Sequence, residues 1–105
     1  MLALAVTGAT RSEVLPQVPT MDEFVPGYEA STWWGVGAPK GTSTQIIEKL
    51  NKDINAVVAE PNIKARLVGL GLQPMQLTSA EFTKLIADAT NKWGQVIRAA
   101  NIKPE

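Results

Sequence analysis

The sequence GYEASTWWGVGAP, residues 27–39, places two of the chain's three tryptophans next to each other. Side chains alternate between the two faces of a β-strand, so Trp33 and Trp34 can both be buried only if both faces are covered. The face that carries Trp33 is half glycine, which allows another backbone or a ligand to approach closely. We therefore predict a strand over residues 29–38 with the two tryptophans on opposite faces.

The composition narrows the classes of function. The chain has 105 residues, of which 45% are hydrophobic and 19% charged, as in one ordinary globular domain. Ten basic and ten acidic residues cancel, which gives no indication of nucleic-acid binding. Histidine and cysteine are both absent, so disulfides, thiol nucleophiles, Cys/His zinc sites and histidine bases are excluded. We expect no enzyme, no metal and no cofactor.

The N-terminal quarter combines a short apolar run with a proline-rich loop. Residues 2–7 predict a buried strand that starts without a lead-in, so we expect Met1 to lie partway along a longer protein; an ordinary short N-terminal strand is the alternative. No secretory signal peptide is visible in this stretch. Residues 8–26 read as loop, with one helical turn predicted over residues 21–24 by the capping-box spacing of Thr20 and Glu23.

Three amphipathic helices follow. Thr42 and Gln45 have capping-box spacing ahead of an apolar stripe that continues to Val58. A second, short helix is predicted from Pro61 to the glycines at positions 69 and 71. An edge strand is predicted over residues 72–77, interrupted by a proline. A long third helix follows, which begins at a capping box of Thr78 and Glu81 and ends at Asn101, Lys103 and Pro104. Trp93 lies on the apolar stripe of this helix and is expected in the core.

These helices carry more apolar surface than two or three short strands can cover. At about 25 cal/mol per Å² of apolar surface, one uncovered face costs several kcal/mol, against a typical total stability of about 5–15 kcal/mol. Either the helices fold back into a compact small domain, or a partner supplies the missing surface. We expect a partner, which is the absent part of a longer protein or a second copy of the chain. The fold class predicted is α/β, helix-rich, with two or three short strands.

Four stretches together carry a resemblance: ALAVTGATR, LPQVPTMDEFVPGYEASTWWGVGAPKGTSTQIIEKLN, ARLVGLGLQPMQLTSAEF and KWGQVIRAANIKPE. The order and spacing of their turn, strand and helix-start motifs resemble the C-terminal part of the Bug-type receptors of tripartite tricarboxylate transporters. The resemblance covers essentially the whole chain.

This resemblance implies a periplasmic-binding-protein-like (type II) fold of two α/β lobes around a cleft. Residues 1–38 would be a strand–loop–strand segment of the second lobe and the crossing between lobes, and residues 39–105 would be C-terminal helices that pack on the first lobe; together they form one structural unit. Similar proteins are periplasmic, bind small carboxylates, deliver them to subunits of a membrane transporter and catalyse nothing.

Candidate ligand-binding residues lie on the crossing strand and after the first strand. They are Ser31, Thr32, Trp33, Trp34, Thr7 and Gly8. Hydroxyl groups and open backbone N–H groups there can hydrogen-bond a carboxylate, while the alternative is that both indoles are simply packed at a lobe junction. Arg11 could pair with a carboxylate, but a loop arginine on the surface is the expectation.

Two functions from different classes remain open. The first is a receptor fragment that binds small carboxylates weakly or not at all by itself, because half of the cleft is elsewhere. The second is a small homodimeric interaction module with no ligand role, in which exposed helix faces are covered by a second copy. A small enzyme is a distant third because no convergent set of acids and bases is visible.

Overall fold

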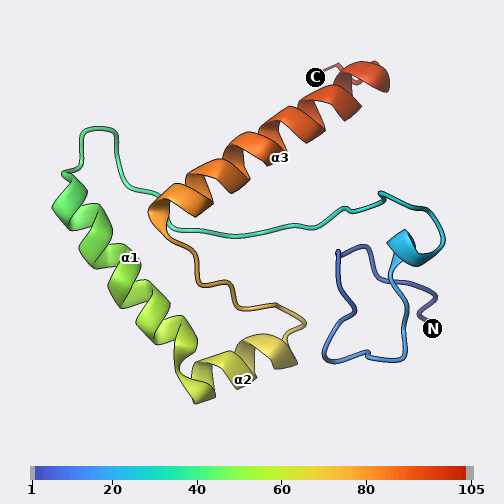
Figure 1. Cartoon of the computed structure of the whole chain (residues 1–105), viewed down its shortest axis with the longest axis horizontal. Coiled ribbons are helices and arrows are strands. Elements are labelled where there is room, and N and C mark those ends of the chain that lie inside the picture. The colour runs from blue at the N-terminus through green and yellow to red at the C-terminus, as the bar shows by residue number, and fades with distance from the viewer. Residues whose placement is uncertain (1, 104–105) are drawn as a thin grey trace.

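The computed structural model describes residues 2–103, so the expectations that concern Met1 and Pro104 lie outside the described residues. The chain runs through a single 3-10 turn, η1 (Met21–Glu23), and three α-helices. These are α1 (Thr44–Ala59), α2 (Pro61–Gly69) and α3 (Ser79–Ala99), joined by extended loops (Figure 1). All three predicted helices and the predicted turn are therefore present.

Two of the helix boundaries follow from capping residues that the sequence indicated. The Thr78 hydroxyl accepts from the Glu81 backbone N–H at 3.2 Å, and the Glu81 carboxylate accepts from the Thr78 N–H at 2.8 Å. This reciprocal pair satisfies backbone donors that the first turn of α3 leaves unpaired. Pro61 stands at the start of α2, where its missing N–H is harmless, and Gly71, just beyond the helix, has φ of 78°.

The predicted capping box at the start of α1 is wrong by one residue. The helix begins at Thr44 with Ser43 as its N-cap. The Thr42 hydroxyl instead donates to the Pro39 carbonyl at 2.8 Å, which closes the turn before the helix. That turn uses the side chain that would otherwise have capped the helix.

The prediction of two or three short strands is wrong for residues 2–103. The three stretches expected as strands are extended, but the only pairing assigned among the described residues is an isolated parallel bridge between Val6 and Thr20. In that bridge Val6 N–H donates to Pro19 at 2.8 Å, and Met21 N–H donates to Val6 at 2.8 Å. A strand needs a neighbour about 4.8 Å away to pair with its backbone, and this chain places none along residues 31–38.

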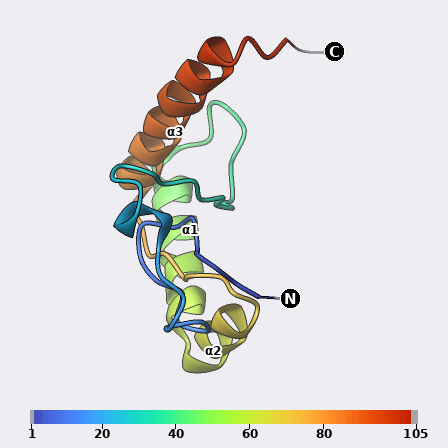
Figure 2. The same cartoon turned by 90° about the vertical axis from the view of Figure 1, so that its right-hand side faces the viewer.

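The fold is open for its size. Its accessible surface is 8707 Å², whereas a compact protein of 11.3 kDa exposes about 5,700 Å². Its radius of gyration is 16.7 Å, whereas a compact 105-residue domain has about 13 Å. Figure 2 shows the helices arranged in one layer rather than around a core, consistent with a shortest extent of 26 Å.

The open surface includes the apolar stripes of the helices. Among the described residues only Val18 and Thr20 are buried. The exposed apolar residues of α1 include Ile46, Leu50, Ile54 and Val57, and those of α3 include Ile86, Trp93, Val96 and Ile97. The expectation that Trp93 lies in the core is wrong for this chain, since the residue is 41% exposed. The alternative of a compact small domain covered from within is thereby contradicted.

One polar contact fixes the chain between α2 and α3. The side-chain amides of Asn51 and Asn55 on α1 both donate to the Leu77 carbonyl, at 2.8 and 3.0 Å. This holds residues 72–77 against α1 without a β-ladder. These two hydrogen bonds therefore fix the position of the start of α3 relative to α1. α3 in turn contacts the candidate site.

Candidate functional site

The crossing segment, defined as residues 29–38, carries four of the six predicted ligand-binding residues. The structure brings it next to the other two, because the Ala30 N–H donates to the Thr7 carbonyl at 2.9 Å. Thr7, Ser31 and Thr32 are exposed, and Gly8 is half-buried. Two stretches more than twenty residues apart in sequence thus form one surface.

The two adjacent tryptophans lie in different surroundings, which is one of the two arrangements that the sequence left open. Trp33 is half-buried and meets Phe82 of α3 edge to face, with ring centroids 5.3 Å apart and planes at 84°. This is a favourable geometry for two aromatic quadrupoles. Trp34 points away and is 74% exposed. Its indole is available to a ligand or to another protein surface.

Gly35 is required by the position of the Phe82 ring. A Cβ built on Gly35 would lie 2.1 Å from Phe82 Cζ, far inside contact distance. Gly37 is different, because a Cβ there would meet nothing within 4 Å. The glycine-rich face predicted from the sequence therefore has two uses, a close approach at Gly35 and an open backbone at Gly37.

Lys92 and Glu29 form a second attachment that sequence reasoning missed. The Lys92 ammonium on α3 donates both to the Glu29 carbonyl and to the Glu29 carboxylate. It also lies 5.6 Å from the centroid of the Trp93 ring. Chiefly through the hydrogen bond from Lys92, and also through Ser31, the pKa of the Glu29 carboxyl is lowered. The two residues are 63 positions apart, so no local pattern could have indicated the pair.

The Ser31 hydroxyl already donates a hydrogen bond within the chain. It donates to the second carboxylate oxygen of Glu29, so its lone pairs remain but its proton is used. Ser31 was predicted as a donor to a ligand carboxylate. In this arrangement it can act toward a ligand only as an acceptor, whereas the exposed Thr32 hydroxyl and the backbone N–H groups of the crossing segment can still donate.

Arg11 is paired within the loop, as expected of a surface arginine. Its Nε and Nη2 atoms donate to the two carboxylate oxygens of Glu23, at 2.9 and 2.7 Å. This fork geometry, together with the Thr20 N–H, lowers the pKa of the Glu23 carboxyl. The Arg11 guanidinium therefore holds η1 through Glu23, and these two donors are used within the chain.

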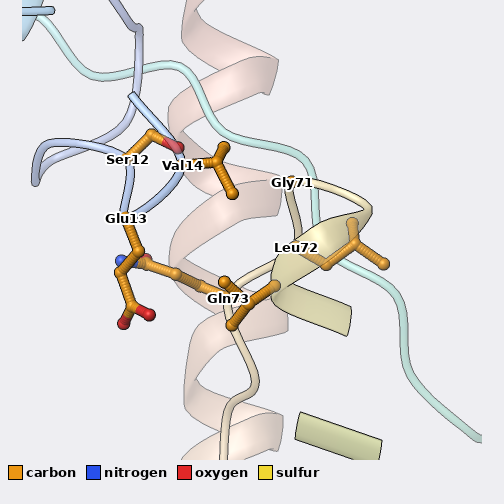
Figure 3. Close-up of a pocket in the computed structure, with 7 residues that line it drawn as sticks. Ser12, Glu13, Val14, Gly71, Leu72 and Gln73 are labelled. Carbon is orange, nitrogen blue, oxygen red and sulfur yellow. The ribbon is translucent and has the colours of Figure 1, made fainter. Parts of the chain in front are cut away.

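Two pockets lie away from the predicted residues. One has an empty volume of about 190 Å³, and Figure 3 shows Ser12–Val14 of the N-terminal loop and Gly71–Gln73 around it. The other, with an empty volume of about 590 Å³, is an open depression that includes Lys64 and Pro74. Neither pocket is lined by residues of the crossing segment. The predicted ligand-binding residues therefore lie outside these two pockets.

Neither a metal centre nor a membrane span is found in the described part of the chain. Between residues 2 and 103, no three His, Cys, Asp or Glu side chains are placed to hold a metal ion. Over the same range, none of the helices combines the length and the apolar character that crossing a membrane requires.

Comparison with known proteins shows which family this chain resembles in sequence. The sequence profile of the tripartite tricarboxylate transporter family receptor matches residues 1–102. The chain is 38% identical over 97 residues to the "UPF0065 protein in tcbD-tcbE intergenic region" of Pseudomonas sp. (strain P51), covering 90% of this chain and 29% of that protein. It is 36% identical over 102 residues to protein BugT of Bordetella pertussis, covering 96% of this chain and 31% of BugT.

A solved structure is also similar. The chain matches R. palustris Rpa4515, determined with adipate, at a TM-score of 0.82 and 34% identity, over 97% of this chain and 34% of that one. The chain therefore spans between 29% and 34% of the length of these three relatives. The resemblance predicted from the sequence is confirmed: the chain belongs to the tripartite tricarboxylate transporter receptor family.

Proposed function

We propose that this chain is the C-terminal part of a periplasmic receptor that binds small carboxylates and passes them to the membrane subunits of a tripartite tricarboxylate-type transporter. The family match over residues 1–102 supports the receptor role. The similarity to Rpa4515, which was determined with adipate, supports a dicarboxylate as the class of ligand. The division into a crossing part, residues 1–38, and a helical part, residues 39–105, belongs to the same proposal.

The observation that carries the proposal is the state of the crossing segment. Among the described residues, no backbone N–H of positions 32–38 donates to another backbone group of the chain. Trp34 is exposed beside these groups, and the backbone at Gly37 is open. Free N–H groups next to an indole offer hydrogen bonds for a carboxylate and apolar contact for the carbon chain between two carboxylates.

This surface is one wall of a binding site rather than a closed cleft. A ligand that is gripped from one side loses little water and keeps much of its freedom, so binding free energy is small. We therefore propose that the chain alone binds dicarboxylates weakly or not at all. The receptor that includes the remaining two thirds closes the site.

Calorimetric titration tests the proposal directly. Adipate and a tricarboxylate such as citrate are titrated into the 105-residue chain and into the complete receptor that contains it. The complete receptor is expected to bind at least one of them with micromolar affinity, and the chain alone to bind neither at that level. Binding by neither protein overturns the receptor function, and micromolar binding by the chain alone overturns the one-wall site.

A matched pair of variants links the binding to Trp34. In the complete receptor, Trp34→Ala is expected to weaken dicarboxylate binding about tenfold, as truncation of an aromatic anchor commonly does. Phe24→Ala removes an aromatic side chain of comparable exposure, 68%, from outside the crossing segment and is expected to leave binding unchanged. Equal effects of the two variants would remove Trp34 from the proposed site.

The exposed helix faces support a second candidate, a homodimeric interaction module without a ligand role. The accessible surface exceeds that of a compact monomer by about 3,000 Å² per chain, enough for a large interface between two copies. Light scattering on the purified chain, combined with the titration above, separates the two. A dimer in a protein whose complete form binds no carboxylate favours the module, and carboxylate binding by the complete receptor favours the first proposal.

A further inference from the structure

The crossing segment needs support that its own backbone does not supply. Its first residues have one backbone bond to the rest of the chain, from Ala30 to Thr7, and positions 31–38 have none among the described residues. An isolated extended segment of this kind samples many conformations, at a cost of about 1–2 kcal/mol per residue to fix. Side-chain contacts must therefore hold it in place.

Two such contacts come from one helix. Lys92 of α3 bonds the carbonyl and the carboxylate of Glu29, at the beginning of the segment. Phe82, also on α3, packs against Trp33 and over the backbone of Gly35. Both contacts are partly shielded from water, since Lys92, Glu29, Trp33 and Phe82 are all half-buried.

The spacing of the two contacts fits an antiparallel arrangement. Ten helical residues separate Phe82 from Lys92, a rise of about 15 Å. Four to six extended residues separate Glu29 from Trp33 and Gly35, a span of about 13–20 Å. Figure 1 shows the segment running from the N-terminal loops to the beginning of α3, where the next loop leads into α1. The helix and the segment thus match in length between their two attachment points.

Lys92 sets the chemistry as well as the position of the segment. Its ammonium compensates the Glu29 carboxylate, and that carboxylate in turn accepts the Ser31 hydroxyl proton. Without the cation, an ionised Glu29 would stand uncompensated beside the surface proposed to receive a carboxylate. Like charges repel, so this would weaken binding of an anionic ligand.

We propose that Lys92 is a positioning residue for ligand binding: from α3 it fixes Glu29 and Ser31 and neutralises Glu29, so that the crossing segment presents its free N–H groups and Trp34 to a dicarboxylate. This inference rests on the carboxylate-binding function proposed above. Lys92 does not itself contact the ligand, because its charge is directed to Glu29.

Three variants of α3 test the inference in two independent measurements. Lys92→Met removes the charge and keeps an unbranched stem, Lys92→Arg keeps the charge, and Lys84→Met is the matched control. Lys84 lies on the same helix, pairs with Asp88 one turn on, and is more exposed than Lys92. The first measurement is the ¹H–¹⁵N nuclear Overhauser effect of residues 29–32 in the chain. The second is adipate affinity of the complete receptor by calorimetry.

Lys92→Met is expected to lower the Overhauser values of residues 29–32 clearly and to weaken adipate binding about tenfold, the effect of losing a charged hydrogen bond. Lys92→Arg is expected to restore both, and Lys84→Met to change neither. If Lys92→Met matches Lys84→Met in either measurement, the positioning role is overturned. If the unaltered receptor binds no dicarboxylate, the proposed function has failed, and the Overhauser values still decide whether Lys92 fixes the segment.

Discussion

The ring of Phe82 occupies the space that a side chain at position 35 would fill: a Cβ on Gly35 would lie 2.1 Å from Phe82 Cζ. This contact explains why position 35 is a glycine. The backbone must approach α3 closely at this position, so that Trp33 can pack against the same ring.

Gly35→Ala is expected to destabilise the chain by about 1–3 kcal/mol, the usual cost of forcing an extra methyl into a packed contact. Urea denaturation followed by circular dichroism measures the change. Gly37→Ala is the control and is expected to be neutral or slightly stabilising, because a Cβ there meets nothing within 4 Å. Adding Phe82→Leu to Gly35→Ala should recover part of the loss. Equal stability of the two alanine variants would mean that the ring does not constrain position 35.

Thr78→Ala is expected to cost about 1 kcal/mol through loss of the N-cap of α3. The hydroxyl accepts the Glu81 N–H, which the helix itself cannot satisfy. Thr83→Ala is the matched control, because the Thr83 hydroxyl donates to a carbonyl that is already part of the helix. The helical circular-dichroism signal and the midpoint of urea denaturation are measured for both variants. A larger loss in the control would place the stabilising contact elsewhere.

Acid is expected to destabilise the chain below a pH of about 4.5, the ordinary pKa of a glutamate. Folding lowers the pKa of Glu23, Glu29 and Glu81, through Arg11, Lys92 and the Thr78 N–H respectively. A lowered pKa means that the ionised form stabilises the fold, fully above the ordinary value and progressively less as pH falls through the lowered one.

Stability measured against pH in urea tests this expectation. Glu81→Gln keeps an acceptor for the Thr78 N–H but no longer titrates, so it should retain its stability near neutral pH and lose less of it in acid. An acid loss that is equally steep in the variant would contradict a contribution from Glu81.

Val57→Lys is expected to leave the stability of the isolated chain within about 0.5 kcal/mol, as for an ordinary surface substitution. Val57 is 53% exposed on the apolar stripe of α1. In an assembly that covers this stripe, the charge would be buried, so association or folding of the complete receptor should fail. Ala56→Lys, at an exposed position about 100° around α1 from Val57 and off the apolar stripe, should be tolerated in both forms. Tolerance of Val57→Lys in the complete receptor would show that the stripe stays open.

Local patterns predicted the helices well. The spacing of Thr78 and Glu81, the proline at the start of α2 and the glycines after it each act within a few residues, so they can be read directly from the sequence. The alternation at Trp33 and Trp34 is equally local, but it left open whether both indoles are packed; in this chain Trp33 is packed and Trp34 is exposed.

Contacts that depend on distant residues could not be predicted. The strands failed because extended residues become strands only beside a partner, and this chain does not place one along the crossing segment. The Lys92–Glu29 pair and the Phe82–Gly35 contact join α3 to a segment far away in sequence. Their only local signals were a half-glycine strand face and an aromatic ring on the stripe of α3.

The central claim is that this chain has apolar faces made to be covered by another protein surface. Small-angle scattering on the purified chain as it leaves a size-exclusion column tests this most directly. We predict either an assembly heavier than 11.3 kDa or a monomer with a radius of gyration near 16.7 Å. A monomer with a radius of gyration of about 13 Å, the value of a compact domain of this length, would contradict the claim.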